Sequence, residues 1–427
     1  MYIEEAEEKG EGAEVKLRGW VYRERSSNKV AFVRLRDKTG TIQCVFKEDE
    51  VEEETFEKAA DIRIESSVEI EGTIHEDERA PTGYEVHASN INVIHNAERF
   101  PITDDKSTSF LLDKRHLWIR SGKMRNMMKV RETIIDAARN FFKERGWIEV
   151  QPPLITASAC EGGSTLFNLD YFGEDAYLSQ SGQMYAEALT FSLEKVFAFA
   201  PSFRAEKSKT KRHVTEYWHL EPEAAWVDHE ENMEIQEKLI EHICQKVVEE
   251  RSEELEALGR DPEVIASVSA PFDRMTYTEA VEKLQEEGFG IEWGDDFGTP
   301  EERFLTEDRK EPLTVEKYPV EAKSFYMKSD PEKPEQVLCD DVIAPEGYGE
   351  MIGGSERETD NQVLIDRLKE EGADLDHYTW YLDLRKYGSV PHSGFGLGIE
   401  RLIRWITDMD HIRDTIPFPR TPNRFQP

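Results

Sequence analysis

Two short segments combine residue types that bind phosphate and a nucleotide base. The first reads FRAE over residues 203–206 and is followed by Arg212 and His213. The second is the glycine-rich run GFGLGIER over residues 394–401, which ends in Arg401. Arginine binds phosphate oxygens through a planar fork and stacks on bases, and glycines let the backbone approach a nucleotide closely. These two segments predict an ATP site.

Neither segment is a common nucleotide-binding loop. The sequence contains no GxxxxGK[ST] loop, and no GxGxxG opens a βαβ unit. An arginine and a glutamate two positions apart on a strand more often form a surface salt bridge, and taken alone the FRAE segment leaves that alternative open. The chain is expected to hold ATP by a different device.

Composition limits the class of protein. A chain of 427 residues is too long for one ordinary domain, and no apolar run approaches the length of a membrane span. The N-terminus is acidic and lacks the pattern of a signal peptide. The cysteines are widely separated, which argues against a zinc site and against a disulfide framework: Cys44, Cys160, Cys244 and Cys339. We expect a reducing, cytoplasmic setting and no membrane partner.

The formal net charge of -35 conflicts with a nucleic-acid partner, because phosphate neutralisation supplies much of the affinity for RNA. One interpretation is that no nucleic acid binds. The other, which we favour as a hypothesis, is that acidity is an adaptation to a saline cytoplasm that screens long-range repulsion. Cations remain near the N-terminus at Arg18, Arg23, Arg25 and Lys29. Full solubility and activity without added KCl would count against this hypothesis.

Residues 15–97 are predicted to form a small β domain. Five segments carry β-branched or alternating patterns, and a helix is predicted between the third and fourth at residues 51–60. The strands are expected at residues 15–22, 31–36, 40–46, 67–74 and 85–94. This order is typical of an OB barrel, although a generic small β-barrel fits the pattern equally well.

The remainder is predicted to be an α+β domain with a mainly antiparallel sheet flanked by helices, because its strands and helices do not alternate regularly. Strands are expected near residues 177–178, 197–203, 213–225, 350–354 and 380–384, and helices at 123–145, 183–192, 230–251, 276–287, 356–371 and 398–408. We divide the chain into residues 1–98, a connector at 99–121, and residues 122–427. Within the last part, residues 253–335 read as a charged, irregular insert.

The two chemical segments resemble motifs 2 and 3 of the class II aminoacyl-tRNA synthetases. The run WYLDLRKYGSVPH over residues 380–392 is similar to the branch that charges aspartate and asparagine tRNAs, and most similar to archaeal asparaginyl-tRNA synthetases. The matching segments run from Leu17 to the C-terminus. The resemblance implies an anticodon-binding OB-fold and a homodimer formed through motif 1, near residues 123–153, although those residues fit an ordinary core helix and strand equally well.

The resemblance also implies roles at the ATP site. Arg204 would bridge the α-phosphate and the amino-acid carboxylate, and adenine would lie between Tyr217 and Arg401. The complete implied ATP set is Arg204, Glu206, Arg212, His213, Tyr217, Glu350, Gly398 and Arg401. Of these, Arg204, Glu350 and Arg401 are the predicted catalytic residues. For Mg²⁺ the implied ligands are Glu350 and Asp341, with Asp340 an alternative to the second.

The residues implied to bind the amino acid distinguish asparagine from aspartate, the two substrates of this branch. Glu161 and Gln183 match the family's groups for the α-ammonium. A carboxamide offers an acceptor and two donors, so Arg357 would donate to its oxygen and Glu221 would accept from its NH₂. Aspartate enzymes carry a lysine where this chain has Ala186. The predicted reaction therefore forms asparaginyl-adenylate from asparagine and ATP, and then transfers asparagine to the terminal ribose of its tRNA.

Two further residues are implied for tRNA recognition. Phe32 would stack on an anticodon base, and Gln43 would read an edge of uracil. A core phenylalanine and a surface glutamine are the ordinary interpretation of both. Two other functions remain open: an aspartyl-tRNA synthetase, perhaps one that charges both tRNAs, and an ATP-dependent asparagine synthetase built on the same catalytic core.

Overall fold

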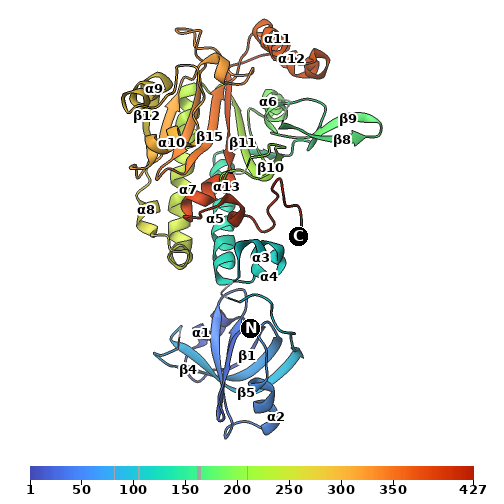
Figure 1. Ribbon diagram of the computed structural model, residues 1–427, viewed down its shortest axis with the longest axis vertical. Helices are drawn as coiled ribbons and strands as arrows, with labels where there is room; N and C mark the ends of the chain where they lie inside the picture. Colours follow the sequence, from blue (N-terminus) through green and yellow to red (C-terminus); the bar gives the residue numbers. More distant parts are fainter. Residues whose placement is uncertain (81, 104–105, 161–164, 209) are drawn as a thin grey trace. The chain divides into compact units, whose positions relative to one another are not determined.

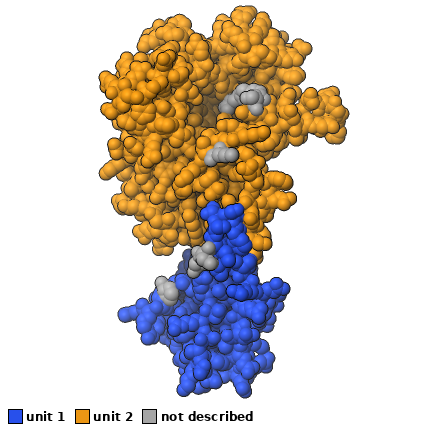
Figure 2. Space-filling model, in the orientation of Figure 1, with its two compact units in different colours: residues 1–111 blue, residues 112–427 orange. Residues whose placement is uncertain are grey.

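The computed structural model forms two compact units, residues 1–111 and residues 112–427, shown in separate colours in Figure 2. The described residues are 1–80, 82–103, 106–160, 165–208 and 210–427. The boundary between the units falls inside the connector predicted at residues 99–121. That connector carries two short helices: α3 (Thr108–Asp113) and α4 (Arg115–Trp118).

The first unit is a closed five-stranded barrel, which confirms the predicted OB-fold (Figure 1). Its strands pair in the order β1-β2-β3-β5-β4: β1 (Glu14–Ser26), β2 (Val30–Arg36), β3 (Thr41–Lys47), β4 (Ser67–Glu76) and β5 (Tyr84–His95). Alternate side chains such as Val15, Leu17 and Ile42 fill the interior. A predicted helix, α2 (Glu53–Ala60), follows β3, and a short helix not predicted from the sequence, α1 (Ile3–Lys9), precedes the barrel.

The second unit is built on an eight-stranded sheet in the order β12-β13-β14-β15-β16-β11-β10-β6. Its strands are β6 (Ile148–Val150), β10 (Lys195–Phe203), β11 (Glu216–Ala225), β12 (Asp273–Thr276), β13 (Leu313–Glu316), β14 (Cys339–Ala344), β15 (Gly349–Glu356) and β16 (His392–Gly398). All neighbouring pairs are antiparallel except β12 with β13 and β6 with β10. The prediction of a mainly antiparallel sheet is therefore confirmed.

Two long helices pack with this sheet to form the main core: α5 (Gly122–Glu144) and α7 (His229–Leu258) (Figure 1). Ser121 caps α5 by accepting a hydrogen bond from the backbone N–H of Met124. Val130, Ile134 and Ala138 recur every four residues and are buried on one stripe of the helix. These helices support the strands that carry the site.

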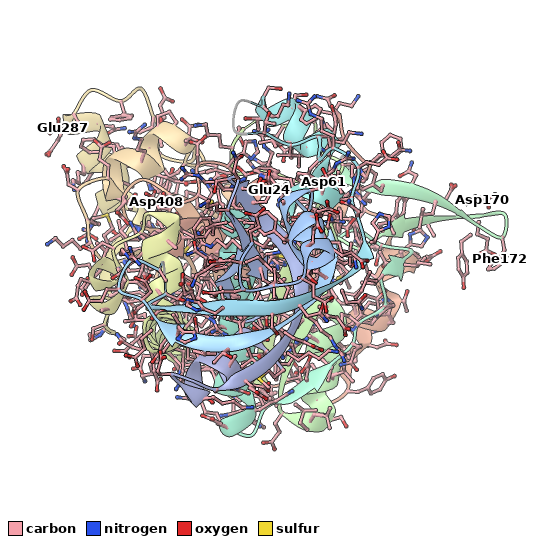
Figure 3. All side chains as sticks on the ribbon, turned by 90° about the horizontal axis from the view of Figure 1, so that it is seen from below. Glu24, Asp61, Asp170, Phe172, Glu287 and Asp408 are labelled. Atoms are coloured by element: carbon pink, nitrogen blue, oxygen red, sulfur yellow. The ribbon has the colours of Figure 1, made fainter. Side chains whose placement is uncertain are left out.

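The other helices are shorter, and a separate three-stranded sheet stands beside the main one. The helices are α6 (Gln183–Leu193), α8 (Pro262–Ala266), α9 (Tyr277–Glu286), α10 (Thr299–Thr306), η2 (Val320–Ala322), α11 (Asn361–Glu370), η3 (Leu375–Tyr378), α12 (Thr379–Lys386), α13 (Ile399–Ile406) and η4 (Ile412–Thr415). The small sheet contains β7 (Ile155–Thr156), β8 (Phe167–Tyr171) and β9 (Glu174–Leu178). Its hairpin projects from the second unit, with Phe172 94% exposed at the tip (Figure 3).

Two predictions about this unit are wrong. The strand expected at residues 380–384 is the helix α12, in which Tyr381, Leu382 and Arg385 are buried at helical rather than alternating spacing. The insert expected to be irregular at residues 253–335 contains regular elements, and its strands β12 and β13 extend the central sheet. The remaining predicted strands and helices are present with shifted ends. No helix within the described residues has the length and apolar character needed to cross a bilayer.

Candidate active site

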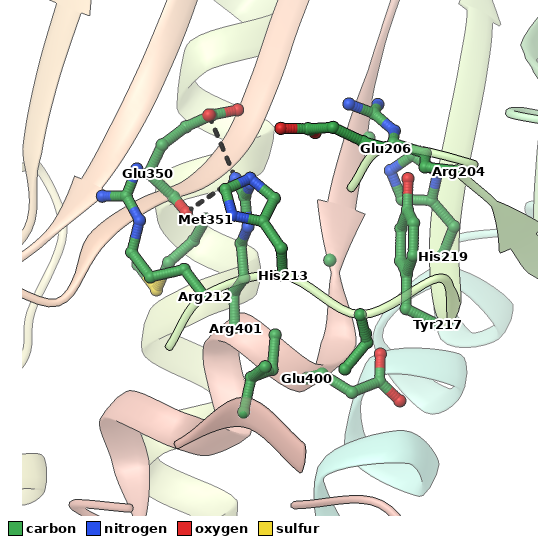
Figure 4. A pocket seen from close by; sticks show the side chains of 14 residues that line it. Arg204, Glu206, Arg212, His213, Tyr217, His219, Glu350, Met351, Glu400 and Arg401 are labelled. Atoms are coloured by element: carbon green, nitrogen blue, oxygen red, sulfur yellow. Dashed lines mark hydrogen bonds and ion pairs between the residues drawn. The ribbon is translucent and has the colours of Figure 1, made fainter. Parts of the chain in front are cut away.

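A pocket opens where β11, β15 and β16 lie side by side, and Figure 4 shows its charged side chains converging from several elements. The cavity has a volume of about 100 Å³. Its walls are Arg204, Glu206, Arg212, His213, Val214, Tyr217, His219, Glu350, Met351, Gly396, Gly398, Glu400, Arg401 and Ile412. Every residue predicted to bind ATP lines this one pocket.

The first predicted segment enters the pocket from the β10–β11 hairpin. Arg204 follows the end of β10 directly, and its backbone N–H donates to the carbonyl of Thr215 at 3.0 Å. This pairing places the Arg204 guanidinium carbon 5.9 Å from the centre of the Tyr217 ring, whereas Glu206 is exposed at the pocket edge. A guanidinium and an aromatic face thus lie together. Such a pair could bind a phosphate through the cation and stack on a nucleotide base through the ring.

Arg212 and His213 lie on the loop between the same strands. Arg212 forms a forked ion pair with Glu302 of α10, in which Nη2 lies 3.3 Å from Oε1. The imidazole of His213 lies within hydrogen-bond distance of the hydroxyls of Ser208 and Thr210. Burial lowers the pKa of His213, and the nearby Arg401 lowers it further. A lowered pKa favours the neutral imidazole, which can donate a hydrogen bond from one ring nitrogen and accept one at the other.

Arg401 and Glu350 lie on the same side of the pocket as Arg212 and His213 (Figure 4). Nη1 of Arg401 donates to Oε2 of Glu350 at 3.0 Å and to its backbone carbonyl at 3.1 Å. Burial favours the neutral carboxyl, but Arg401 and Lys323 together hold the pKa of Glu350 below its ordinary value. Glu350 is thus a carboxylate that faces the pocket.

The two aspartates considered as second metal ligands point to opposite sides of β14. Oδ1 of Asp341 and Oε1 of Glu350 lie within 3.6 Å of the point where a Cβ on Gly353 would be. Asp340 instead contacts His229 of α7, with Oδ1 3.6 Å from Nδ1. Asp341 is therefore the aspartate beside Glu350, and the oxygens of these two partly exposed carboxyl groups fit the preference of Mg²⁺ for hard ligands.

Asp341 is held by its own neighbours. Nζ of Lys323 lies 2.7 Å from Oδ2 of Asp341. Burial, opposed by Lys323 and assisted by the charge of Glu350, raises the pKa of Asp341 to about 7. A divalent cation beside Oδ1 would favour the ionised form. Among the described residues no group of three or more potential metal-ligating side chains occurs, so any cation here takes further oxygens from its ligand or from water.

Three of the residues predicted to bind the amino acid are buried: Gln183, Glu221 and Arg357. Glu221 accepts from the backbone N–H of Gly182 at 2.9 Å and from the hydroxyl of Ser181, and its Oε1 lies 3.2 Å from Nδ1 of His219. Burial raises the pKa of Glu221, but His219, Ser181 and Gly182 outweigh it, so the pKa is below its ordinary value. Glu161, predicted for the α-ammonium, lies outside the described residues.

Gln183 is fixed at the start of α6 by a buried cluster. Its Nε2 donates to Oε1 of Glu187 at 3.1 Å, and Glu187 also accepts from Tyr381 and Arg385. Because a carboxylate only accepts, the NH₂ of Gln183 must face Glu187, which directs the amide oxygen elsewhere. That oxygen is then available to a positively charged group such as an α-ammonium.

Arg357 pairs with Glu223, which was not among the predicted site residues. Its guanidinium binds both carboxylate oxygens of Glu223, with Nε 3.2 Å from Oε2, and it donates to the hydroxyl of Ser355 at 2.6 Å. Burial raises the pKa of Glu223, although Arg357 opposes the shift. Glu221 and Glu223 lie two positions apart on β11 and are both buried on the pocket side of this strand.

Several residues that lie in or beside the pocket were not identified from the sequence. The alternation of side chains along β11 would have identified two of them, His219 and Glu223. Tyr217, Glu221 and the missed His219 and Glu223 alternate along β11, so a period of two marks them as one face. On the neighbouring strand, a Cβ at Gly394 would collide with Glu223, and one at Gly396 would lie 2.5 Å from Nε2 of His219. The glycines of the second predicted segment thus make room for these side chains.

The residues predicted to bind the anticodon lie together on the first unit. Phe32 of β2 and Gln43 of β3 line one shallow hollow. Its other lining residues are Arg23, Glu24, Arg25 and Arg34. Nε2 of Gln43 donates to Glu85 at 2.9 Å, which fixes the orientation of its amide. Three arginines around an aromatic ring suit a single-stranded nucleic acid.

Comparisons with known proteins agree with this geometry. Residues 107–422 match the model of the class II tRNA synthetases (D, K and N), and residues 15–94 match that of the OB-fold nucleic acid binding domain. The asparagine–tRNA ligase of Thermococcus gammatolerans is 52% identical over 100% of this chain and 99% of its own length. That of Thermococcus kodakarensis is 51% identical over 100% and 99%.

A solved structure extends the likeness to three dimensions. The asparaginyl-tRNA synthetase of Pyrococcus horikoshii complexed with asparaginyl-adenylate has a TM-score of 0.97 and 50% identity, covering 100% of this chain and 99% of that one. The resemblance predicted from the motifs is therefore confirmed. The chain belongs to the class II tRNA synthetases of the D, K and N group.

Proposed function

We propose that the protein is an asparagine–tRNA ligase that joins asparagine to its tRNA with ATP. The observation that carries the choice of amino acid is the buried set of Glu221, Glu223 and Arg357 beside the phosphate-binding pocket. Both oxygens of Glu223 bind Arg357, so Glu221 is the carboxylate that would accept from the NH₂ group of a carboxamide. An aspartate side chain would bring a third carboxylate into the same buried space, where like charges repel strongly.

In the first step, an oxygen of the asparagine carboxylate attacks the α-phosphorus of ATP, and the bond to pyrophosphate breaks. The chain supplies no nucleophile and acts by positioning the reactants and stabilising charge. Arg204 neutralises the α-phosphate as negative charge develops, and Tyr217 and Arg401 flank the base. Gln183 accepts a hydrogen bond from the α-ammonium, which aligns the carboxylate for attack.

Arg212 and His213 bind the leaving pyrophosphate. Mg²⁺, held by Glu350 and Asp341, would neutralise the phosphate charge that resists departure. The ion pairs of Arg401 with Glu350 and of Arg212 with Glu302 keep these side chains in place before ATP binds. In the second step, a hydroxyl of the terminal ribose of tRNA attacks the acyl carbon, and AMP leaves.

The proposal includes the partners of the chain. The barrel carries Phe32 and Gln43 for the anticodon, and this argues against an asparagine synthetase, which needs no anticodon site.

We also propose a cytoplasmic homodimer. Its supporting feature is a set of apolar side chains after α5 that are 38–47% exposed in a single chain: Ile148, Leu154 and Ile155. Light scattering would report a dimer, and a monomer at working concentration would contradict this part.

The test of the function is acylation of tRNA with labelled asparagine in the presence of ATP and Mg²⁺. Asparaginyl-tRNA, AMP and pyrophosphate should form together and depend on all components. A matched reaction supplies aspartate and ammonium without tRNA. Free asparagine formed there would identify a synthetase of the amino acid. Charging of tRNA when labelled aspartate replaces asparagine in the first reaction, with little charging by asparagine, would identify the aspartate enzyme.

A further inference from the structure

Glu302 connects the pocket to a part of the chain that the motifs do not cover. It lies on α10, within residues 253–335, and its side chain is 7% exposed. Its carboxylate binds the guanidinium of Arg212 through both oxygens. The same carboxylate accepts from the backbone N–H of Glu350, with the nitrogen 3.0 Å from Oε2. One buried side chain therefore holds both an arginine of the β10–β11 loop and the strand that carries Glu350.

The backbone at Gly349 leaves room for the ion pair between Arg212 and Glu302. Gly349 has φ of +90°, a conformation that L side chains rarely adopt. A Cβ at this position would collide with the Arg212 guanidinium and lie 2.6 Å from Oε2 of Glu302. The ion pair thus packs directly against the start of β15, where no side chain other than hydrogen fits. This close approach leaves Arg212 little freedom to adopt another position.

We propose that Glu302 is a positioning residue, which fixes Arg212 for the polyphosphate end of ATP. The inference rests on the proposed ATP site. An arginine on an irregular loop loses much rotamer freedom when it binds a ligand, and a preformed ion pair removes part of that loss before the ligand arrives. Glu302 acts through Arg212 and does not touch the base, the ribose or the α-phosphate.

The test compares ATP with AMP, because AMP lacks the phosphates that Arg212 would bind. Glu302→Gln removes the charge and preserves the size of the side chain. Loss of one charge-assisted contact should weaken ATP binding about tenfold while AMP binding changes less than about twofold. Both affinities are measured by calorimetry on the full-length protein, and thermal melts verify that the variant is folded. Glu307→Gln is the matched control, because Glu307 is exposed just after α10 and pairs with Arg303.

Equal weakening of ATP and AMP would overturn the inference, because it would indicate a general structural defect. Unchanged or tighter ATP binding would also overturn it, since Glu302 would then be no more than a counter-ion. Arg212→Gln is measured in parallel. If that variant also binds ATP and AMP in the wild-type ratio, the proposed role of Arg212 is wrong. If it alone loses the preference for ATP, only the role of Glu302 is wrong.

Discussion

The guanidinium of Arg357 and the carboxylate of Glu223 form a forked ion pair in which the two side chains are 3% and 1% exposed. Both charges have lost their water, so each depends on the other for stabilisation. The pair sits next to Glu221, two positions earlier on β11. Arg357 is thereby held with Nε and Nη2 toward Glu223 and with Nη1 donating to the hydroxyl of Ser355.

Replacing Glu223 should damage asparagine binding more than ATP binding. Glu223→Gln removes a buried partner charge, which should destabilise the fold by about 3 kcal/mol and free Arg357 from its position. The KM for asparagine should rise at least tenfold, and the KM for ATP should change less than about threefold. Both are measured by pyrophosphate exchange. Glu216→Gln, at an exposed position on the same strand, is the control. Equal increases in both KM values would contradict the assignment.

Mg²⁺ dependence should separate the two neighbouring aspartates. Because Asp341 lies beside Glu350, Asp341→Asn should raise the Mg²⁺ concentration for half-maximal exchange by at least about tenfold. Asp340→Asn should lower the melting temperature, because it breaks the contact with His229, and leave the Mg²⁺ requirement unchanged. A Mg²⁺ titration of the exchange rate is the measurement. A reversed pattern would show that Asp340 is the ligand.

Much of the fold follows from local patterns, whereas the complete set of pocket residues came from the resemblance to the family, and the exceptions have physical reasons. Periodicity predicts α5 and β11 because their buried faces repeat at 3.6 and 2 residues. It fails for α12, where aromatic and branched residues favour a strand until Tyr381 and Arg385 pack against Glu187. Pairs such as Arg212 with Glu302 or Arg357 with Glu223 join distant segments, so no local spacing reveals them.

A substitution in the hollow on the barrel should weaken tRNA binding and leave amino-acid activation unchanged. Phe32→Ala removes a ring that would stack on an anticodon base, which should raise the KM for tRNA about tenfold. Pyrophosphate exchange without tRNA should be unchanged, because the hollow lies on the first unit. Trp20→Ala removes another aromatic ring of the barrel, 48% exposed and outside the hollow, and is the control. Equal increases in the KM for tRNA in Phe32→Ala and Trp20→Ala would contradict a specific role of the Phe32 ring.

Acid stability should depend on His411, which caps η4. Its Nδ1 accepts from the backbone N–H of Arg413 at 3.2 Å, and protonation would abolish this acceptor. Burial, with help from Arg413, lowers the pKa of His411 to about 4, below its ordinary value near 6.5. The folded state therefore binds this proton more weakly than the unfolded state. The stabilisation is complete above pH 6.5 and is lost as the pH falls toward 4.

The variant His411→Asn keeps a capping acceptor and removes the titration. Between pH 7 and pH 4 it should lose less stability than the wild type, by about 1 kcal/mol after allowance for partial exposure of the ring. Melting temperatures across this range are the measurement, and His377→Asn, at an exposed position, should follow the wild type. Parallel curves for all three proteins would contradict the assigned cause.

The choice of asparagine over aspartate is tested most directly by pyrophosphate exchange with each amino acid in turn, at equal concentrations and without tRNA. A site that matches a carboxamide with buried polar groups can reject the unmatched carboxylate by about 10⁴-fold. We predict rapid exchange with asparagine and a rate with aspartate lower by about that factor. Comparable rates, or exchange with aspartate alone, would contradict the arrangement of Glu221, Glu223 and Arg357 as a carboxamide site.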